Sequence, residues 1–338
     1  MDLAIRNLFS EFQESVFARM DLEKSLKESG TFVRKTVKGK IYWYLQRYEE
    51  GQAKQVYFGR TDGKTEAQVV EARKKRRGER EILKKMRNDE ERRAAALRRA
   101  GLPFADAAAA TVLESLSEKS LIDRGGVLVG SHAFAAYSGI LGFLFEKQSL
   151  KTLDIDVVGD KTLRPDDRSD VPAMEILSAD FRPIPPLSLK NLPNRFASPH
   201  GLRVDFLIPQ RGKPKAGCRA VGLKDVGAEP LPFLDFLIER PIRVALLSPW
   251  GGIPVTIPDP SRFAIHKLIV SVRRSVAEDA KRAKDLVQAR QLIVACAQER
   301  PADLKQALRD ARDRGKRWRQ SLNRAVTALP DEIAGLLS

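Results

Sequence analysis

Cysteine is scarce in this chain, and long apolar runs are missing. The 338 residues include two cysteines, Cys218 and Cys296, which lie far apart and form no CxxC or Cys/His ligand spacing. This excludes a disulfide framework and a cysteine-based zinc site, so we expect both thiols to be packing residues. No apolar run approaches the roughly 20 residues of a transmembrane helix, and residues 1–17 are not typical of a signal peptide. We therefore expect a cytoplasmic protein that has no membrane partner.

Positive charge is concentrated in two segments. The formal net charge is +16, from 60 Lys and Arg against 44 Asp and Glu. Residues 64–100 hold 14 basic and 7 acidic side chains, residues 262–319 hold 16 and 7, and the remainder is neutral. Concentrated charge of one sign causes self-repulsion that the phosphates of a polyanion relieve. The pattern therefore favours a polyanion-binding surface, although a solvated, highly charged helix also fits residues 64–100.

The hydrophobic pattern predicts an α+β protein with a small sheet and a long basic helix at its N-terminus. Apolar residues recur at helical spacing over 1–28, and over 31–60 the period changes to two, interrupted by turn residues at Lys38-Gly39 and 50–52. A helix of some 35 residues follows from Lys64, and a second helix is expected over 104–120.

The second half of the chain predicts a mixed sheet with flanking helices and a helical C-terminal region. Short apolar runs separated by Pro and Gly are typical of a mixed domain over 125–258. Pro258 to Ser261 predict a stop followed by a helix N-cap, and helical periodicity then continues to the C-terminus. We predict four regions, namely 1–63, 64–120, 121–260 and 261–338.

Three aspartates in strand-like segments are the candidate catalytic and metal-binding residues. Asp154 and Asp156 are two residues apart within LDIDVVG, so on a strand both side chains project from one face. Asp205 lies between Val204 and Phe206 and projects away from them. Carboxylates on two strands can hold Mg²⁺, or Mn²⁺, and two such ions assist an in-line phosphoryl displacement.

Gly130-Ser131 is the candidate phosphate-binding turn. It joins the apolar run Val127 to Val129 to the helix-like sequence SHAFAAYSGI. A helix N-terminus presents free backbone N–H groups, and glycine allows a phosphate close to the backbone. The turn is therefore suited to hold a triphosphate, and no Rossmann or P-loop pattern competes with it.

Gly130, Ser131, Asp154, Asp156 and Asp205 together resemble the signature of the DNA polymerase β-type nucleotidyltransferase superfamily. The similarity is closer to bacterial nucleotidyltransferase-like proteins that include abortive-infection and toxin-type enzymes. Their helical region has a lysine followed by a Lys-Asp pair, which Lys267 and Lys284-Asp285 match. The resemblance covers about 120–300 and implies nucleotide binding by these residues. The interval between Ser131 and Asp154 is longer than in compact members, which suggests an extended helix or an inserted loop.

Several candidate residues also have a structural interpretation. Lys267 lies in an apolar helix, where it either contacts the β- and γ-phosphates or extends its ammonium to solvent. Lys284 and Asp285 are either part of the nucleotide site or a surface ion pair. His132 and His266 are either hydrogen-bonded structural residues or proton carriers.

The N-terminal sheet is the second candidate nucleic-acid contact. Tyr42 and Tyr44 share one face of the expected middle strand, where they either stack on unpaired bases or pack against a helix. The opposite face, with Ile41, Trp43 and Leu45, is expected to pack on a helix. The segment also resembles, by pattern only, the small DNA-binding modules of phage-type integrases. The basic side chains expected to contact nucleic acid are Arg73, Lys74, Lys75, Arg76 and Arg77.

We therefore expect a Mg²⁺-dependent nucleotidyltransferase that moves NMP from an NTP to a hydroxyl, with release of pyrophosphate. The two basic segments favour RNA as the acceptor, and we expect a tRNA 3′ end. Transfer to a protein hydroxyl, as in AMPylation, stays open. A non-catalytic nucleic-acid-binding or regulatory protein with the same fold is the alternative from another class.

Overall fold

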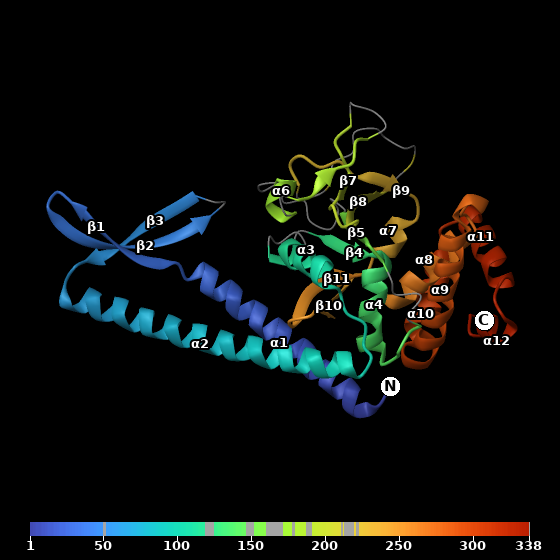
Figure 1. The fold of residues 1–338 in the computed structure, drawn as a ribbon, viewed down its shortest axis with the longest axis horizontal. Coiled ribbons are helices and arrows are strands. Elements are labelled where there is room, and N and C mark those ends of the chain that lie inside the picture. The colour runs from blue at the N-terminus through green and yellow to red at the C-terminus, as the bar shows by residue number, and fades with distance from the viewer. Residues whose placement is uncertain are drawn as a thin grey trace.

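The structure, a computed structural model, has an N-terminal arm, a central mixed sheet and a C-terminal helical region (Figure 1). The described residues are 1–49, 52–118, 125–146, 152–159, 172–177, 180–186, 191–210, 212, 220 and 223–337. We use the term arm for the two long N-terminal helices together with the small sheet between them in sequence. The α+β class predicted from the sequence is confirmed.

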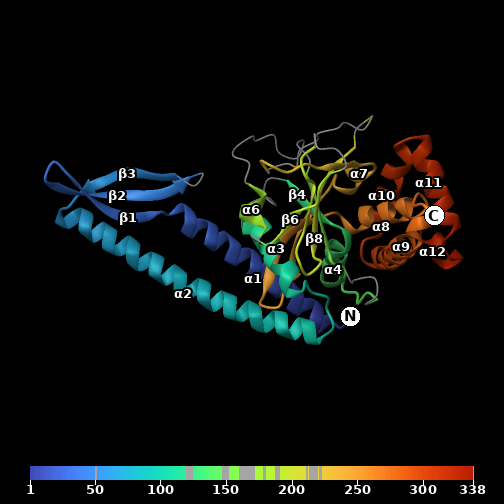
Figure 2. The same ribbon diagram turned by 45° about the horizontal axis from the view of Figure 1, so that its top comes forward.

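Two long helices form the shaft of the arm. Helix α1 (Leu3–Glu28) and helix α2 (Gly63–Arg99) pack against each other, and their N-caps are Asp2 and Asp62. Figure 2 shows the small sheet beside one end of α2 and the central region beside the other. The buried residues of α2 lie toward these two ends. These are Thr65, Val69, Glu90, Ala94 and Leu97.

The small sheet is antiparallel and consists of β1 (Thr31–Val37), β2 (Lys40–Glu49) and β3 (Gln52–Arg60), in that order. Trp43 is buried, and the guanidinium of Arg73 in α2 lies 5.0 Å from the centre of its ring. The expected packing of the tryptophan face on a helix is thus confirmed for Trp43. It is wrong for Ile41, which lies at the turn end of the sheet and is 45% exposed.

Among the described residues, the central sheet has six strands with mixed directions, in the order β4-β5-β8-β7-β6, and β9 pairs with β8. Strand β5 is antiparallel to β4 and parallel to β8, which places these three strands side by side in the middle of the molecule (Figure 1). Their bounds are β4 (Gly126–Val129), β5 (Asp154–Gly159), β6 (Arg182–Pro183), β7 (Arg195–Ala197), β8 (Arg203–Pro209) and β9 (Glu229–Leu231).

Short helices and a two-stranded sheet flank the central sheet. Leu247, in the first strand of the two-stranded sheet, lies in one hydrophobic cluster with Phe9 and Phe12 of α1 and Leu97 of α2. This cluster joins the arm to the rest of the molecule. The elements are α3 (Ala107–Glu118), α4 (Gly130–Leu141), α6 (Ala173–Ile176), α7 (Leu234–Leu237), β10 (Ile242–Leu247) and β11 (Gly252–Ile257).

The C-terminal region is helical, as predicted, and shares one continuous hydrophobic core with the central sheet. The N-cap of its first helix is Asp259, whose carboxylate accepts hydrogen bonds from the backbone N–H groups of Ser261 and Arg262. No helix among the described residues has the length and apolar character needed to cross a membrane. The helices are α8 (Pro260–Ser271), η1 (Val276–Glu278), α9 (Asp279–Glu299), α10 (Pro301–Asp313), α11 (Lys316–Thr327) and α12 (Asp331–Gly335).

Candidate active site

The strand register brings the three predicted aspartates to one face of the central sheet. Asp156 of β5 is the direct partner of Asp205 in the parallel strand β8, and Asp154 lies two residues before Asp156. The alternation of β5 leaves both aspartates partly accessible, while Ile155 and Val157 are buried on the opposite face. The prediction of a shared carboxylate face therefore agrees with the geometry of the strands.

Gly130 forms a tight turn directly against Asp156. It follows β4, whose last residue pairs with Asp156, and it begins α4 with a φ of 69°. A Cβ atom at this position would lie 2.3 Å from Oδ2 of Asp156. Ser131 is buried in the first turn of α4. The free N–H groups of this helix end thus lie beside the carboxylates, an arrangement suited to hold an anion.

Burial raises the pKa values of both Asp156 and Asp205. Burial raises the pKa of Asp156 to about 6, the carboxylate of Asp205 adds to the effect, and Lys267 opposes it. Burial also raises the pKa of Asp205, and the guanidinium of Arg195 opposes that effect. A positive ligand placed between the two side chains would favour their ionised forms.

Two arginines that the sequence reasoning missed pair with these carboxylates. Arg203 Nε lies 2.9 Å from Asp154 Oδ1, and Arg195 Nε lies 3.2 Å from Asp205 Oδ2. Arg195 also contacts Glu229 of β9 at 2.7 Å. Arg203 had a signal in the sequence, since it precedes Asp205 by two residues on the same strand. Arg195 had none, because its strand is three residues long and pairs with Asp205 only in the folded sheet.

The predicted lysines reach the site from the C-terminal helices. Lys267 of α8 lies near enough to Asp156 to influence its pKa, and its ammonium bonds to Asp285 of α9 at 2.6 Å. Arg274 bonds to the other oxygen of Asp285 at 2.5 Å. Burial, and then Lys267, lower the pKa of Lys284, and the charges of Asp154 and Asp156 oppose that effect. Asp285 therefore lies behind Lys267 and holds its ammonium in place. The interpretation of Asp285 as part of a surface ion pair is wrong, because its carboxylate is buried and pairs with Lys267 and Arg274.

Two histidines and two cysteines also had expectations from the sequence. Burial lowers the pKa of His132 to about 4 and that of His266 to about 3, so both imidazoles are neutral near pH 7. Cys296 is a buried free thiol, and burial raises its pKa to about 12, in agreement with a packing role. Cys218 lies outside the described residues.

The donor set is chemically suited to a divalent cation, although ion pairs engage two of its members. Within the described residues, no three His, Cys, Asp or Glu side chains are arranged as a metal-binding group. Asp154 and Asp205 are instead engaged with Arg203 and Arg195. Oδ1 of Asp205 is nevertheless buried and has no hydrogen-bond partner among the described atoms. Carboxylate oxygens are the ligands that Mg²⁺ prefers, so the residues fit this ion once the arginines release them.

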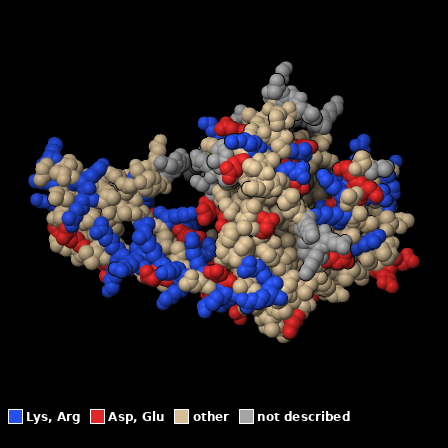
Figure 3. Space-filling view, in the orientation of Figure 1, with Lys and Arg blue, Asp and Glu red and all other residues tan. Residues whose placement is uncertain are grey.

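The predicted nucleic-acid contacts lie elsewhere, on the arm. Figure 3 shows Lys and Arg side chains gathered along the arm. Two of the five predicted basic residues bond to the small sheet. Arg73 donates to the carbonyl of Phe32, and Arg76 donates to the hydroxyl of Thr31. The other three members, Lys74, Lys75 and Arg77, are exposed.

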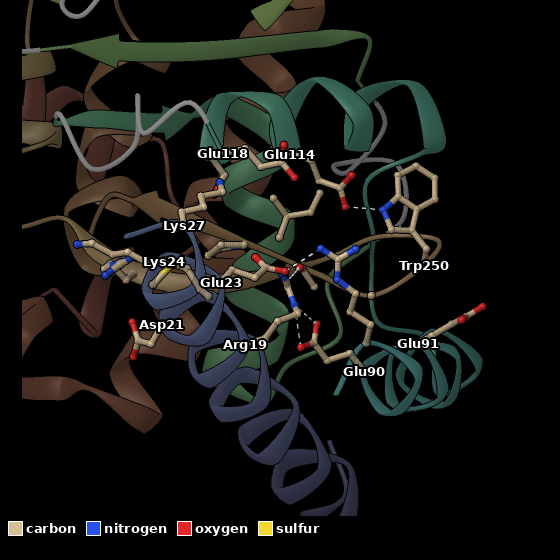
Figure 4. Close-up of a pocket in the computed structure, with 18 of the residues that line it drawn as sticks. Arg19, Asp21, Glu23, Lys24, Lys27, Glu90, Glu91, Glu114, Glu118 and Trp250 are labelled. Atoms are coloured by element: carbon tan, nitrogen blue, oxygen red, sulfur yellow. Dashed lines mark hydrogen bonds and ion pairs between the residues drawn. The ribbon is translucent and has the colours of Figure 1, made fainter. Parts of the chain in front are cut away.

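A pocket of about 900 Å³ between α1, α2, α3 and the β10–β11 turn contains none of the predicted site residues (Figure 4). Arg19 lies at its centre, bonded to Glu90 and Glu23 and, at 2.8 Å, to the carbonyl of Gly252. Trp250 donates its indole N–H to Glu114 at the rim. The bond to Gly252 joins the arm to the central region, and the bond to Glu90 joins α1 to α2, so Arg19 has a structural role.

One comparison with known protein families matches the part of the chain that contains the central sheet. Residues 107–313, more than half of the chain, match a family described as Nucleotidyltransferase. This range includes all the site residues on the central sheet and on α8 and α9, and it excludes the arm. No curated protein matches the chain. No solved structure matches it either.

Proposed function

The chain belongs to the nucleotidyltransferase family, whose members transfer nucleotidyl groups, and from this premise we propose a metal-dependent transfer of NMP from an NTP to an RNA hydroxyl. The observation that supports the proposal is the register of β5 and β8. It places Asp156 beside Asp205, with Asp154 on the same face and the Gly130 turn in contact with Asp156. The three carboxylates and the N-terminus of α4, which is suited to bind an anion, therefore lie around the same point.

The residues around this point are suited to bind the nucleotide. The backbone N–H groups at the start of α4 and the Ser131 hydroxyl hold phosphate oxygens. Lys267 and Lys284 provide positive charge from α8 and α9, and Asp285 fixes the ammonium of Lys267 at 2.6 Å. The ammonium of Lys267 is thus bonded to a buried carboxylate instead of extending to solvent, and it lies near the reacting groups.

Asp154, Asp156 and Asp205 would hold Mg²⁺ or Mn²⁺. Such ions, when bound, neutralise charge and align the attacking and leaving oxygens. We assign Asp205 as the group that accepts the proton of the acceptor hydroxyl, from its position beside Asp156 in the neighbouring strand. A bond then forms between that oxygen and the α-phosphorus, the bond from the α-phosphorus to the bridging oxygen breaks, and pyrophosphate leaves. Positioning and charge compensation account for most of the rate in such a displacement.

The distribution of charge supports RNA as the acceptor. The exposed side chains of Lys74, Lys75 and Arg77 lie on the arm, outside the matched family range. Positive side chains spaced along a helix bind the phosphate backbone without regard to sequence. We infer an acceptor with an extended backbone, for which a tRNA that is labelled at its 3′ end is the best candidate.

The proposal is tested by incubating the protein with each α-labelled NTP, Mg²⁺, and total cellular RNA or protein. We expect label in RNA, and loss of that label for Asp156→Asn, because one carboxylate of the reacting centre is removed. Asp225→Asn is the matched control, since Asp225 is exposed and outside the site. Near-wild-type transfer by Asp156→Asn would refute the assigned site. Label in protein alone would replace the RNA acceptor by a protein hydroxyl.

A further inference from the structure

The small sheet of the arm has one face that is not used for packing on α2. Strand alternation places Tyr42, Tyr44 and Gln46 of β2 on this face, opposite to Trp43. The ring of Tyr57 in β3 lies 5.9 Å from that of Tyr42 and 5.8 Å from that of Tyr44. We call the face formed by Lys35, Tyr42, Tyr44, Gln46, Tyr48 and Tyr57 the tyrosine face.

The opposite face accounts for the attachment of the sheet to α2. The guanidinium groups of Arg34 and Arg73 lie 4.7 and 5.0 Å from the centre of the Trp43 ring. Arg34 also pairs with Glu66 of α2 at 3.0 Å. In both ribbon views α2 runs along one side of the sheet, and no other described element covers the other side (Figures 1 and 2). The tyrosine face is therefore turned to solvent.

The tyrosine face combines accessible rings with hydrogen-bonding groups. Tyr57 is 56% exposed and Tyr48 is 71% exposed. Gln46 donates to the hydroxyl of Tyr48 at 3.0 Å, and Gln55 donates to Gln46 at 2.6 Å, so the polar groups hold the side chains in a row. Large rings that remain exposed in a polar row are suited to stack on flat partners.

Charge identifies the kind of partner. Residues 31–60 contain seven Lys and Arg and two acidic residues, which are adjacent at 49–50. The ammonium of Lys35 lies 5.4 Å from the centre of the Tyr44 ring, so a cation lies directly beside the rings. Aromatic rings with adjacent cations stack on unpaired bases and contact the intervening phosphates. A base-paired duplex buries its base faces and offers the rings nothing on which to stack.

We propose that the tyrosine face binds an unpaired stretch of nucleic acid, by stacking of bases on Tyr42, Tyr44 and Tyr57 and phosphate contact by Lys35. The inference deepens the proposed function, on which it rests, since it identifies a part of the enzyme that holds the acceptor away from the carboxylates. The stacking does not depend on the sugar, so RNA and DNA single strands share the chemistry.

The test is fluorescence anisotropy of the full chain with a labelled RNA of mixed sequence, the same DNA strand, and the matching duplex, without NTP. We expect single strands to bind more tightly than the duplex. Replacing the three tyrosines together by alanine should weaken single-strand binding at least about tenfold, because stacking contributes strongly at each base. The matching phenylalanine variant should bind nearly as the wild type does, because its rings remain.

Val56→Ala is the control, since Val56 is 61% exposed in the same strand as Tyr57 but pairs with Leu45 and so lies on the opposite face. Amide exchange of residues 31–60 verifies that each variant keeps the sheet. Should the alanine variant lose the sheet, Lys35→Gln provides the second test, with an expected decrease of about 0.7 in the slope of log K against log[salt]. Normal binding by a folded alanine variant, or equal binding of the duplex, would overturn the proposal.

Failure of this inference and failure of the proposed function are distinguishable. Asp156→Asn should lose transfer but keep oligonucleotide binding, while the tyrosine variant should keep NTP binding. Tighter binding of RNA than of the DNA strand would support the RNA acceptor, and equal binding would support stacking alone. Binding that is confined to the region of the carboxylates, as mapped by crosslinking, would refute the tyrosine face.

Discussion

At the scale of single residues, Gly130 approaches the carboxylate of Asp156 more closely than any side chain allows. We expect Gly130→Ala to abolish transfer, because the new Cβ would lie 2.3 Å from Oδ2 of Asp156 and must displace it. The left-handed backbone adds about 1–2 kcal/mol of strain. Activity assays and thermal unfolding measure both effects.

Gly39→Ala separates the two contributions. Gly39 has a φ of 74° and no atom within 4 Å of the position of a Cβ, so its substitution causes backbone strain without a collision. It should lower stability by a similar amount and leave transfer intact. Equal activity of the two variants would show that Gly130 has no role beside Asp156.

Asp285 links two cations and makes stability depend on pH. Burial alone would raise its pKa, but Lys267 and Arg274 outweigh this effect and lower the pKa below its usual range. Its contribution to stability is therefore present above about pH 4, the usual pKa of the unfolded state, and is lost as the pH falls through the folded-state pKa. We expect Asp285→Asn to lower the free energy of unfolding by about 3–5 kcal/mol at pH 7.

Urea unfolding at pH 7 and at successively lower pH tests this expectation. The difference between wild type and variant should narrow as Asp285 becomes protonated in both states. Asp279→Asn in the same helix is the control, because Asp279 is exposed and pairs with Arg282 at only 3.8 Å. A difference that stays constant down to acid pH would assign the loss to packing instead of charge.

For the site residues, the sequence predicts which side chains of one strand share a face better than it predicts which side chains pair between strands. Asp154 and Asp156 could be placed on one face because alternation is a local property of the strand. The pairs Arg195–Asp205 and Arg203–Asp154 depend on which strands are neighbours, and the chain returns to β8 through the short strands β6 and β7. The hydrophobic period of a segment does not predict which strands become its neighbours in the sheet.

At the scale of elements, α2 has two faces with different roles. Neutralising Lys74, Lys75 and Arg77 together should lower the salt slope of single-strand binding by about 2, at about 0.7 per phosphate contact. Stability should remain unchanged, because all three side chains are exposed. Anisotropy titrations over a range of salt concentrations, together with thermal unfolding, measure the two quantities.

The matched substitution is Arg73→Gln with Arg76→Gln. These arginines contact Trp43, Phe32 and Thr31, so their loss should loosen the sheet more than it changes the salt slope. An unchanged slope in the Lys74, Lys75 and Arg77 variant would leave this part of α2 as an ordinary solvated helix.

The elements were predictable where a long stretch has one period. Helices α1 and α2 and strands β1 to β3 agree with the expected segments, since their patterns persist for many residues. Helix α4 ends at Leu141, with Gly142 as a left-handed C-cap, so α4 itself does not extend through the interval before Asp154. The alternative of an inserted loop falls partly on residues 147–151, outside the described residues.

At the scale of the whole molecule, the arm and the central region have unequal cores. Trp43 is the one buried hydrophobic side chain among the described residues of 31–60, whereas the central core continues from α3 to the C-terminal helices. We expect amides of β1 to β3 to exchange with solvent faster than those of β4, β5 and β8, because local opening exposes little apolar area. Hydrogen-exchange mass spectrometry measures both sets.

Trp43→Ala should increase this difference in exchange rate between the small sheet and the central sheet. Loss of a large buried side chain lowers the free energy of unfolding by about 3–5 kcal/mol. Exchange should rise in residues 31–60 and stay unchanged in the central sheet. A uniform rise along the chain would show that the arm and the central sheet unfold as one cooperative unit.

The shaft of the arm has a consequence for the size of the acceptor. Helix α2 has 37 residues and thus a length of about 55 Å, with its buried residues confined to the two ends. A stiff rod of this kind fixes the offset between the tyrosine face and the carboxylates. An acceptor held at both points must span that offset, so the enzyme would act as a molecular ruler. Fragments too short to reach both points would be bound without being extended. Selection by length would then need no reading of base sequence.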